Sequence, residues 1–298
     1  MEAPTFAPMD ARWRAILRGE SPAAPAARLG RRLFTAIPGR SRCYFCHVPF
    51  DGGLGHALRV LGYGQSRKNP HLCARCLEAA PEGGAVIPVS VLFADVRGYT
   101  SMTERATTLE VTTLLQRFYA AASGALLRHE AVLGQIAGDE VMAMFVPGLA
   151  GAGYRTSAVA AGRSLLEAMG YTAAGKNWLD VGVGVSSGEE YVGNVGGGGF
   201  KDFTAIGDVT NTAARLQAHA SGDMLIDAPT YDAVADLFPG AERCELQLKG
   251  KELPVVAFRI QVSEGRSSGP TVPDRAAHVG RGEDRPTSTG MTSGSERH

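Results

Sequence analysis

Residues 86–96 form an apolar run with a carboxylate, Asp95, next to its end, and this run restricts the fold more than any other feature. A strand that is apolar along its length is typical of the centre of a sheet, where both faces are covered. A carboxylate at the end of such a strand is costly unless it is paired, hydrogen-bonded or bound to a metal ion. The sequence therefore predicts a central strand that carries a polar site at its end.

The segments that follow alternate between helical and strand periodicity. Apolar residues recur at spacings of three and four from Val111 to Leu126, and residues 152–169 show the same pattern. Strands are expected at residues 132–137, 141–146, 179–186, 191–195, 224–226, 245–248 and 255–260, with a helix at 209–219. The order strand, helix, strand, strand, helix, strand predicts an α+β, ferredoxin-like βαββαβ core with additional C-terminal strands, preceded by a small metal-stapled unit.

Composition divides the chain into four parts. Residues 1–40 are a basic segment with one amphipathic helix from Ala11 to Arg18, and residues 41–80 hold four of the five cysteines. Residues 86–262 carry the α+β pattern, and residues 263–298 lack apolar periodicity and are predicted to be disordered. Because we find neither an apolar run long enough for a membrane span nor a signal peptide, we expect a cytoplasmic protein.

The charges are unevenly distributed along the chain. Residues 1–80 contain twelve Lys and Arg against five Asp and Glu, although the whole chain has 30 of each kind. A basic segment can attract nucleic acid or an acidic partner surface. Since no stacking aromatic residues interleave the arginines, we interpret this segment as a solvated surface and do not expect nucleic-acid binding.

Asp95 and Asp139 are the candidate metal ligands of the α+β part. Asp139 lies in the turn between the two short strands of a predicted hairpin. If the first strand lies beside this hairpin, the two carboxylates converge, and such oxygen ligands suit Mg²⁺ or Mn²⁺. Alternatively, Asp95 caps the following turn and Asp139 is only a turn residue. The spacing alone leaves both interpretations open.

Four segments resemble the motifs of class III adenylate and guanylate cyclases, in the order of that family. Residues 93–100 and 134–145 resemble its two metal-binding segments, residues 203–216 its signature helix with the preceding strand, and residues 248–250 its phosphate-binding turn. Four ordered motifs are more specific than one short match. The resemblance covers about residues 86–260 and implies a purine nucleotide cyclase that acts in signalling and produces a 3′,5′-cyclic nucleotide and pyrophosphate.

The resemblance also implies a role for each matching residue. Asp95 and Asp139, assisted by the backbone carbonyl of Val96, would hold two Mg²⁺ or Mn²⁺ ions in each active site. Asn211 would orient the ribose, and Arg215 would stabilise charge on the α-phosphate and the leaving pyrophosphate. In this family the carboxylates of one chain face the Asn and Arg of the other, which implies a homodimer.

The substrate's phosphates and base would meet a second group of residues. Gln135 and Thr204 stand where the family reads the purine: adenine-selective members commonly have Lys at the position of Gln135, guanine-selective members have Glu, and Thr204 resembles the partner residue of bacterial adenylate cyclases. The Gln135 amide both donates and accepts, so it suits either base. We expect an adenylate cyclase that favours ATP; the alternatives are a guanylate or dual-specificity cyclase, or a catalytically silent nucleotide-binding regulatory module. The phosphate-binding groups would be the backbone N–H groups of Gly98, Tyr99 and Thr100 and the side chain of Lys249.

Two C-x-x-C pairs, Cys43/Cys46 and Cys73/Cys76, can present four thiolates to one tetrahedral ion. In a reducing compartment metal binding is favoured over disulfides, and this segment has few aliphatic residues to stabilise it otherwise. The sequence predicts one Zn²⁺ in a zinc-finger-like unit with four cysteine ligands. An iron centre of rubredoxin type, a redox dithiol pair and unligated thiols are the alternatives. Cys244 is expected to be a buried apolar residue.

Overall fold

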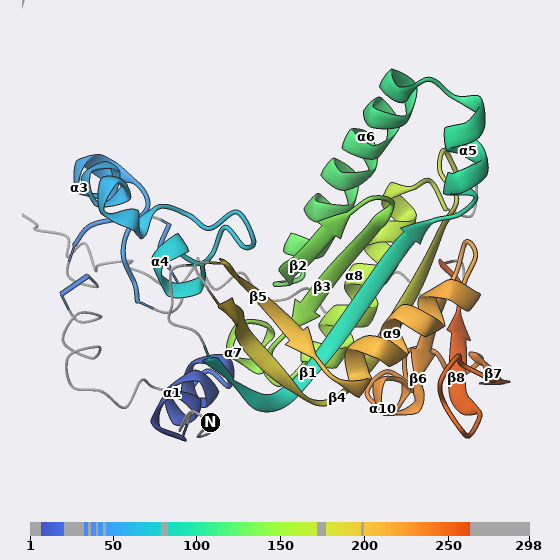
Figure 1. Cartoon of the computed structure of the whole chain (residues 1–298). Helices are drawn as coiled ribbons and strands as arrows, with labels where there is room; N and C mark the ends of the chain where they lie inside the picture. Colours follow the sequence, from blue (N-terminus) through green and yellow to red (C-terminus); the bar gives the residue numbers. More distant parts are fainter. Residues whose placement is uncertain are drawn as a thin grey trace, which may run out of the picture. The chain divides into compact units, whose positions relative to one another are not determined.

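The computed structural model describes residues 7–20, 33–34, 37–39, 41–43, 46–78, 83–171, 177–197 and 200–262 (Figure 1). The described residues belong to a single structural unit. The predicted disordered tail, residues 263–298, and about half of the basic segment 1–40 lie outside the described residues, so these two predictions stay predictions; the helix expected from Ala11 to Arg18 is present as Ala7–Leu17. None of the described helices combines the length and the apolar character that a membrane crossing requires.

A mixed sheet of eight strands forms the centre of the described residues. The strands β4, β1, β3 and β2 are neighbours in this order and all pair antiparallel. With the helices between them they form the predicted βαββαβ arrangement, so the α+β, ferredoxin-like fold with additional C-terminal strands is confirmed. β6, β8 and β7 extend the sheet beyond β4, and β5 pairs with β4 outside this path. The bounds are β1 (Gly83–Val96), β2 (Val132–Ala137), β3 (Glu140–Phe145), β4 (Val181–Gly197), β5 (Phe200–Ile206), β6 (Met224–Asp227), β7 (Glu242–Leu246) and β8 (Val255–Ile260).

Helices cover both faces of the sheet. In Figure 1, α8 lies behind the sheet and α9 in front of it. α6 begins with a capping box between Thr107 and Glu110, which satisfies two backbone donors at its start. The bounds are α1 (Ala7–Leu17), α3 (Gly52–Leu58), a π-helical segment (Arg59–Tyr63), α4 (Ala74–Leu77), α5 (Tyr99–Arg105), α6 (Thr108–Leu127), α7 (Pro147–Ala150), α8 (Tyr154–Ala168), α9 (Asp208–His219) and α10 (Ala228–Tyr231).

The side chains of β1 alternate between two buried clusters. Leu92, Ala94 and Val96 belong to the cluster that contains α6 and α8. Val91 and Phe93 belong to a second cluster, which contains residues of α9, β5 and the N-terminal part of the chain. Because successive residues of a strand face opposite sides, this distribution requires β1 to be covered on both faces. The predicted position of this strand at the centre of the sheet is confirmed.

β4 is one strand of 17 residues where the sequence predicts two. The prediction was wrong because polar residues interrupt the apolar pattern between the two expected strands. These polar groups are satisfied inside the fold. The Ser187 hydroxyl lies 2.7 Å from the hydroxyls of both Ser90 and Thr230, and Glu190 accepts the Thr210 N–H at 3.0 Å. The strand can therefore continue through them.

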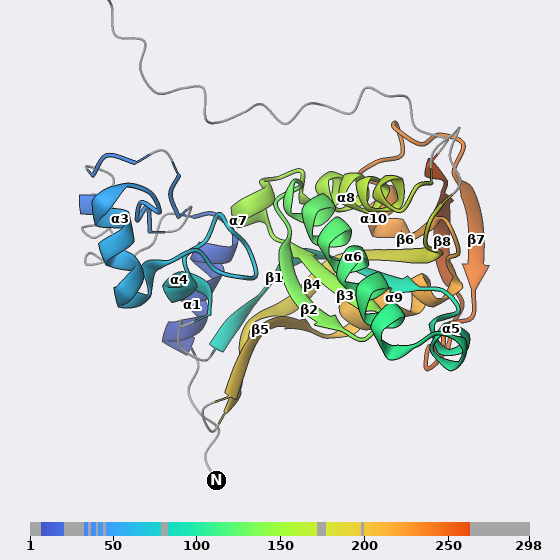
Figure 2. The ribbon, with the colours of Figure 1, turned by 90° about the horizontal axis from the view of Figure 1, so that it is seen from above.

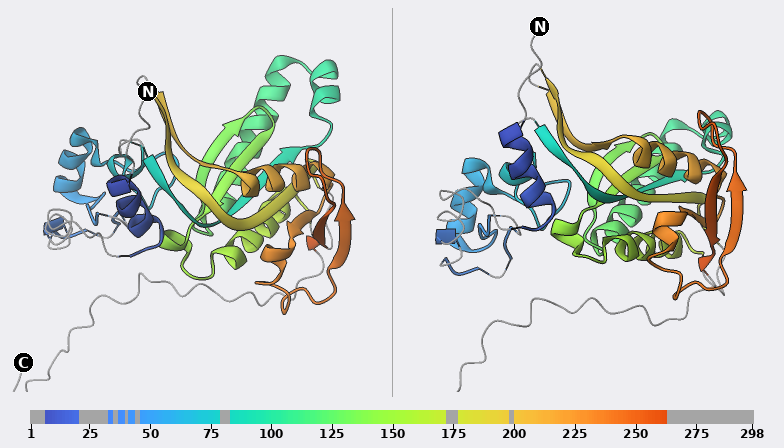
Figure 3. Two further views of the ribbon diagram at one scale, coloured as in Figure 1. Left: turned by 60° about the horizontal axis from the view of Figure 1, so that its bottom comes forward. Right: turned by 90° about the horizontal axis from the view of Figure 1, so that it is seen from below.

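The N-terminal part of the chain packs against the sheet. Trp13 and Leu17 of α1, together with Leu72 and Leu77 beside the cysteines, are buried in the same cluster as β1 and β5. Figure 3 shows α1 beside the start of β1. β5 and the second half of β4 form a hairpin that projects from the sheet on the side of α1 and α4 (Figure 2). The Asn194 amide on this hairpin donates to the Leu77 carbonyl at 3.1 Å. The cysteine-bearing segment therefore shares a buried core with the sheet.

Candidate active site

Asp95 and Asp139 lie at one end of the sheet, where the sequence predicts a convergent pair. β1 pairs with β3 in a register that places Asp95 opposite Glu140, the residue that follows Asp139. The backbone N–H of Val96 donates to the backbone carbonyl of Asp139 at 3.1 Å, which ties the β2–β3 turn to the end of β1. The phenol of Tyr119 on α6 donates to the Gly138 carbonyl and holds the same turn from the other side.

The electrostatics of this pair suit a divalent cation. Burial, and after it the neighbouring carboxylate of Asp139, raises the pKa of Asp95 to about 6. Burial and the charge of Asp139 also raise the pKa of Glu140. Carboxylates placed this close repel each other unless a proton or a cation lies between them. Oxygen donors of this kind are the ligands of Mg²⁺ and Mn²⁺, so the two aspartates fit a site for such an ion.

Arg97 supplies a positive charge beside the pair. Its guanidinium lies 3.5 Å from Asp95 and donates to the Gln217 carbonyl on α9, and its backbone N–H donates to the Asp180 carbonyl at 2.8 Å. The sequence patterns alone did not single out this residue. The only indication in the sequence that Arg97 belongs to the site was its position two residues after Asp95, inside the first motif.

The three predicted phosphate-binding residues, Gly98, Tyr99 and Thr100, come directly after Arg97 in the chain. Gly98 has a φ of 69°, which lets the chain turn from the end of β1 into α5. The first residues of a helix have backbone N–H groups without an acceptor in the helix, so Tyr99 and Thr100 present such groups directly after the aspartate strand. These three residues therefore directly follow the strand whose end carries Asp95, a candidate metal ligand.

Asn211 and Arg215 lie on α9, on the side away from the sheet. α9 packs closely on β4 at Gly184, where an added Cβ would lie 2.2 Å from the Ala213 oxygen and the Gln217 nitrogen. At about 100° per residue, Asn211 and Arg215 are roughly 200° around the helix from Ala213 and Gln217. Asn211 is accordingly exposed and Arg215 is half-buried, and both face away from the strands that carry the aspartates.

The turn that carries Lys249 lies against α9. Lys251 places its Nζ 2.5 Å from both carboxylate oxygens of Asp208, the first residue of α9. A Cβ added at Gly250 would lie 3.3 Å from an Arg215 guanidinium nitrogen. The structure thus brings Arg215 and the exposed Lys249 to one surface. The Lys251–Asp208 pair was missed, although Lys251 is only two residues from the selected lysine.

Gln135 and Thr204, the predicted base-reading pair, lie on β2 and β5. Gln135 is exposed and Thr204 is half-buried. The residue before each of them, Gly134 and Phe203, directs its backbone carbonyl toward the same ammonium group, that of Lys68, at 2.8 and 3.3 Å. The two strands therefore meet at this point. No feature of the sequence pointed to Lys68.

A shallow pocket of about 440 Å³ lies beside the start of α9 and the middle of β4. Ser187, Asp208 and Lys251 are among the residues that line it, and neither Asp95 nor Asp139 does. The candidate metal site is therefore not part of this pocket.

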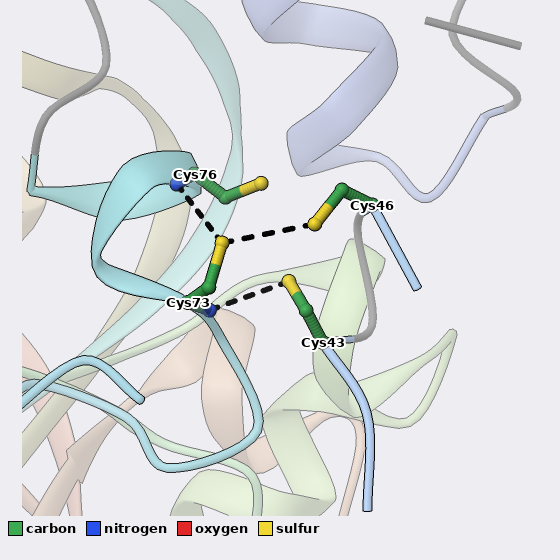
Figure 4. Close-up of side chains that lie close together, drawn as sticks. All are labelled: Cys43, Cys46, Cys73 and Cys76. Carbon is green, nitrogen blue, oxygen red and sulfur yellow. Dashed lines mark hydrogen bonds between the residues drawn. The ribbon is translucent and has the colours of Figure 1, made fainter. Parts of the chain in front are cut away.

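The four cysteines of the N-terminal part form a cluster (Figure 4). Their sulfur atoms all lie within 4.8 Å of one another, and those of Cys46 and Cys73 are 3.7 Å apart. Thiolates on a tetrahedral Zn²⁺, at about 2.3 Å from the ion, are separated by roughly 3.8 Å. The backbone N–H groups of Cys73 and Cys76 donate to the sulfurs of Cys43 and Cys73, both at 3.3 Å.

Their mutual contacts also shift the acidity of the thiols. Hydrogen bonds from Cys46, Cys73 and Cys76 hold the pKa of Cys43 well below its usual range, whereas hydrogen bonding to Cys43 raises the pKa values of Cys46 and Cys76. Four sulfurs in this arrangement fit a tetrahedral thiophilic cation. Tyr44 and Phe45, inside the first pair, lie outside the described residues. Cys244 is half-buried in β7, not buried as expected, and its thiol lies 3.5 Å from the Ala257 carbonyl.

Residues 85–261 match the family model described as "Adenylate and Guanylate cyclase catalytic domain". Among solved structures, the guanylyl cyclase Cya2 is similar with a TM-score of 0.55 and 25% identity, over 60% of this chain and 94% of that one. The adenylyl cyclase CyaB from P. aeruginosa is similar with a TM-score of 0.50 and 27% identity, over 58% of this chain and 93% of that one.

Curated relatives occur in mycobacteria. The protein Rv1319c of Mycobacterium tuberculosis is 29% identical over 166 residues, which cover 54% of this chain and 28% of the relative. The protein Rv1320c of the same organism is 31% identical over 166 residues, which cover 54% of this chain and 26% of the relative. The chain thus spans about a quarter of the length of these relatives.

Proposed function

The chain belongs to the adenylate and guanylate cyclase catalytic domain family, and on this premise we propose that it converts ATP into 3′,5′-cyclic AMP and pyrophosphate as a homodimer. The observation that carries the proposal is the meeting of Asp95 and Asp139 at the end of β1, where burial and the second carboxylate raise the pKa of Asp95. An arrangement that is unfavourable for two bare carboxylates is favourable when they bind cations.

The aspartates and the Val96 carbonyl would hold two Mg²⁺ or Mn²⁺ ions, which when bound lower the pKa of a coordinated hydroxyl and neutralise phosphate charge. Arg97 keeps Asp95 in place by its contact at 3.5 Å. The backbone N–H groups of Tyr99 and Thr100, at the start of α5, donate to the phosphates next to this site.

Arg215 and Lys249 supply positive charge to the triphosphate from α9 and the adjacent turn. The planar guanidinium of Arg215 stabilises negative charge as the bond to pyrophosphate breaks, and Lys249 neutralises the terminal phosphates. Asn211, one helical turn before Arg215, orients the ribose. The Lys251–Asp208 pair holds the Lys249 turn against α9, so these groups keep a fixed relation to one another.

The orientation of the Asn211 and Arg215 side chains on α9 supports the homodimer. Asn211 and Arg215 face away from the sheet that carries Asp95 and Asp139, as the packing at Gly184 requires. In a two-fold dimer, the α9 surface of one chain can face the aspartates of the other, which gives two active sites. The similarity to family members that use such an arrangement supports the same conclusion.

The preference for ATP rests on the residues of the base-reading pair. Thr204 resembles the partner residue of adenylate-type enzymes, and the exposed Gln135 can present either an acceptor or a donor. We therefore propose a modest preference for ATP with measurable turnover of GTP. The similar solved structures include both an adenylyl and a guanylyl cyclase.

The test is the purified full chain with Mn²⁺ and either ATP or GTP, with the cyclic product separated by chromatography. We expect cyclic AMP as the main product and less cyclic GMP. Cyclic GMP as the main product would instead show a guanylate cyclase. Nucleotide binding without either product would identify a silent regulatory module.

For the N-terminal part we propose one Zn²⁺ bound by Cys43, Cys46, Cys73 and Cys76. The sulfur separations support this proposal, and the same geometry would also accept iron. Thiolate ligands of this kind are maintained in a reducing compartment such as the cytoplasm.

A further inference from the structure

Lys68 and Asn69 connect the cysteine-bearing segment to the edge of the sheet. Among the described strands, β2 is the last on its side of the sheet, so no described strand pairs with its outer edge. The Lys68 carbonyl accepts the Leu133 N–H of this edge at 3.0 Å, and the Asn69 amide donates to the Ala131 carbonyl at 2.7 Å. Two consecutive residues of the N-terminal part therefore hydrogen-bond to β2 or to the residue just before it.

The Lys68 side chain extends these contacts to β5. Its ammonium group donates to the Gly134 carbonyl on β2 and to the Phe203 carbonyl on β5, and it forms an ion pair with Asp202 at 2.6 Å. The Lys68 side chain is only 20% exposed, so these interactions are weakly screened. One half-buried cation thus holds together the two strands that carry Gln135 and Thr204.

The loop that presents Lys68 is closed by backbone contacts at and beside Cys73, one of the four clustered cysteines. Gln65 and Cys73 form an isolated β-bridge, and the Ala74 N–H donates to the Gly64 carbonyl at 2.8 Å. Inside the loop, the Ser66 N–H donates to the Leu72 carbonyl, also at 2.8 Å. Lys68 lies at the tip of this loop, five residues before Cys73. A cation bound by the cysteines would hold Cys73, and through it the base of the loop.

We propose that Lys68 is a positioning residue through which the metal-bound four-cysteine unit sets the spacing of Gln135 and Thr204, so that metal occupancy controls the affinity for the nucleoside triphosphate. The proposal rests on the proposed function, since these two residues are its base-reading pair. Without the ammonium group, two backbone carbonyls and Asp202 lose their shared donor, and β2 and β5 are free to separate. The catalytic groups on β1 and α9 do not contact Lys68 and keep their positions.

The test compares full-length Lys68→Met with Lys68→Arg and with the matched control Arg67→Met, which removes an exposed positive charge from the same loop. Met keeps the apolar stem of the side chain, so the substitution removes chiefly the ammonium group. In Lys68→Met we expect KM for ATP to rise about tenfold, as for the loss of hydrogen bonds to a charged group, with kcat changed less than about threefold. Lys68→Arg should restore most of the affinity, and Arg67→Met should behave as wild type.

Removal of the metal from the wild type with a chelator should raise KM to a similar extent. Because metal and Lys68 act on the same strands, stripping the metal from Lys68→Met should add little. Hydrogen exchange gives a readout that does not depend on activity. Amides in β2 and β5 should lose protection in Lys68→Met and in the stripped wild type, while those in β8 should not.

Failure of this inference is distinguishable from failure of the proposed function. If the metal-loaded wild type forms no cyclic nucleotide with Mn²⁺, the proposed function fails, and the exchange experiment still decides the coupling. If β2 and β5 keep their protection after metal removal, or if Lys68→Met binds nucleotide as the wild type does, the coupling is wrong. Should Lys68→Met not fold, Asp202→Asn replaces it; KM should then rise by a smaller factor, about two- to threefold, because the two carbonyl contacts of Lys68 remain, and an unchanged KM together with unchanged exchange in β2 and β5 would contradict the coupling.

Discussion

At the scale of single residues, Asp95 and Asp139 give the most direct prediction. Asp95→Asn or Asp139→Asn should lower kcat by more than about a hundredfold, because loss of a bound cation removes several kcal/mol of transition-state stabilisation. The fold should persist, since burial already disfavours the charged form of Asp95 and raises its pKa. Product formation and thermal melting measure the two effects. Near wild-type kcat in either variant would show that the metal site lies elsewhere.

Gln135 gives a prediction about the base. A lysine there offers only donors, so it favours the adenine N1 acceptor and opposes the N1–H of guanine. Once the bound base covers this exposed position, a polar group left unpaired against it costs about 1–3 kcal/mol, or roughly tenfold or more in selectivity. Gln135→Lys should therefore increase the preference for ATP, mainly by slowing the GTP reaction. The measurement is kcat/KM for both nucleotides; an unchanged ratio would exclude Gln135 from reading the base.

Residues of the site differ in how well the sequence predicts them. Asp95 and Asp139 were predictable because each lies at the end of a local strand pattern within a recognisable motif. Lys68 was not, because its role depends on strands about 65 and 135 positions later in the chain. Local periodicity carries no information on such long-range pairing.

At the scale of elements, Gly184 sets the distance between β4 and α9. Gly184→Ala would place a Cβ 2.2 Å from α9 backbone atoms, so the helix that carries Asn211 and Arg215 must move. We expect destabilisation of about 1–3 kcal/mol or more and a loss of kcat larger than the loss of nucleotide affinity. Gly153→Ala is the control, because nothing lies within 4 Å of its Cβ. Urea unfolding and steady-state kinetics provide the measurements, and equal behaviour of the two variants would contradict close packing at Gly184.

The four-cysteine unit gives a prediction about metal content. Protein purified without chelator should contain about one zinc or iron per chain, and Cys43→Ser or Cys76→Ser should lose it. Because ligand binding is coupled to folding in such units, removal of the metal should unfold residues 41–78 first. Elemental analysis and hydrogen exchange measure these effects. Wild-type protein without either metal, even after reconstitution with Zn²⁺, would overturn the assignment.

The elements themselves follow from sequence to different degrees. α6 was predictable because its apolar residues recur at spacings of three and four, and β8 because it is a short run that is apolar except for Arg259. The continuity of β4 was not, since Ser187 and Glu190 resemble a loop until their partners in β1 and α9 are known. Polar residues inside a strand depend on tertiary contacts that no local window contains.

At the scale of the whole molecule, the proposed homodimer predicts complementation between inactive chains. Asp95→Ala lacks a proposed metal ligand and Arg215→Ala lacks the guanidinium on α9 that stabilises phosphate charge, so each homodimer should be inactive. A mixed dimer contains one intact site, and a mixture should regain up to about a quarter of wild-type activity, since half of randomly paired dimers are mixed. Mixed dimers without activity would contradict a site shared between chains.

The contacts of Lys68 and Asn69 with β2 also affect the solubility of the cyclase part. An open edge strand is a template for pairing with other chains, and proteins commonly cover such edges to avoid aggregation. Here the N-terminal part covers the edge at Ala131 and Leu133, and it buries apolar residues of β1 and β5 as well. A chain shortened to residues 83–262 would expose both surfaces at once. Aggregation through the open edge would then obscure its enzymology, so we expect the N-terminal part to prevent edge-to-edge aggregation while leaving the two-fold dimer free to form.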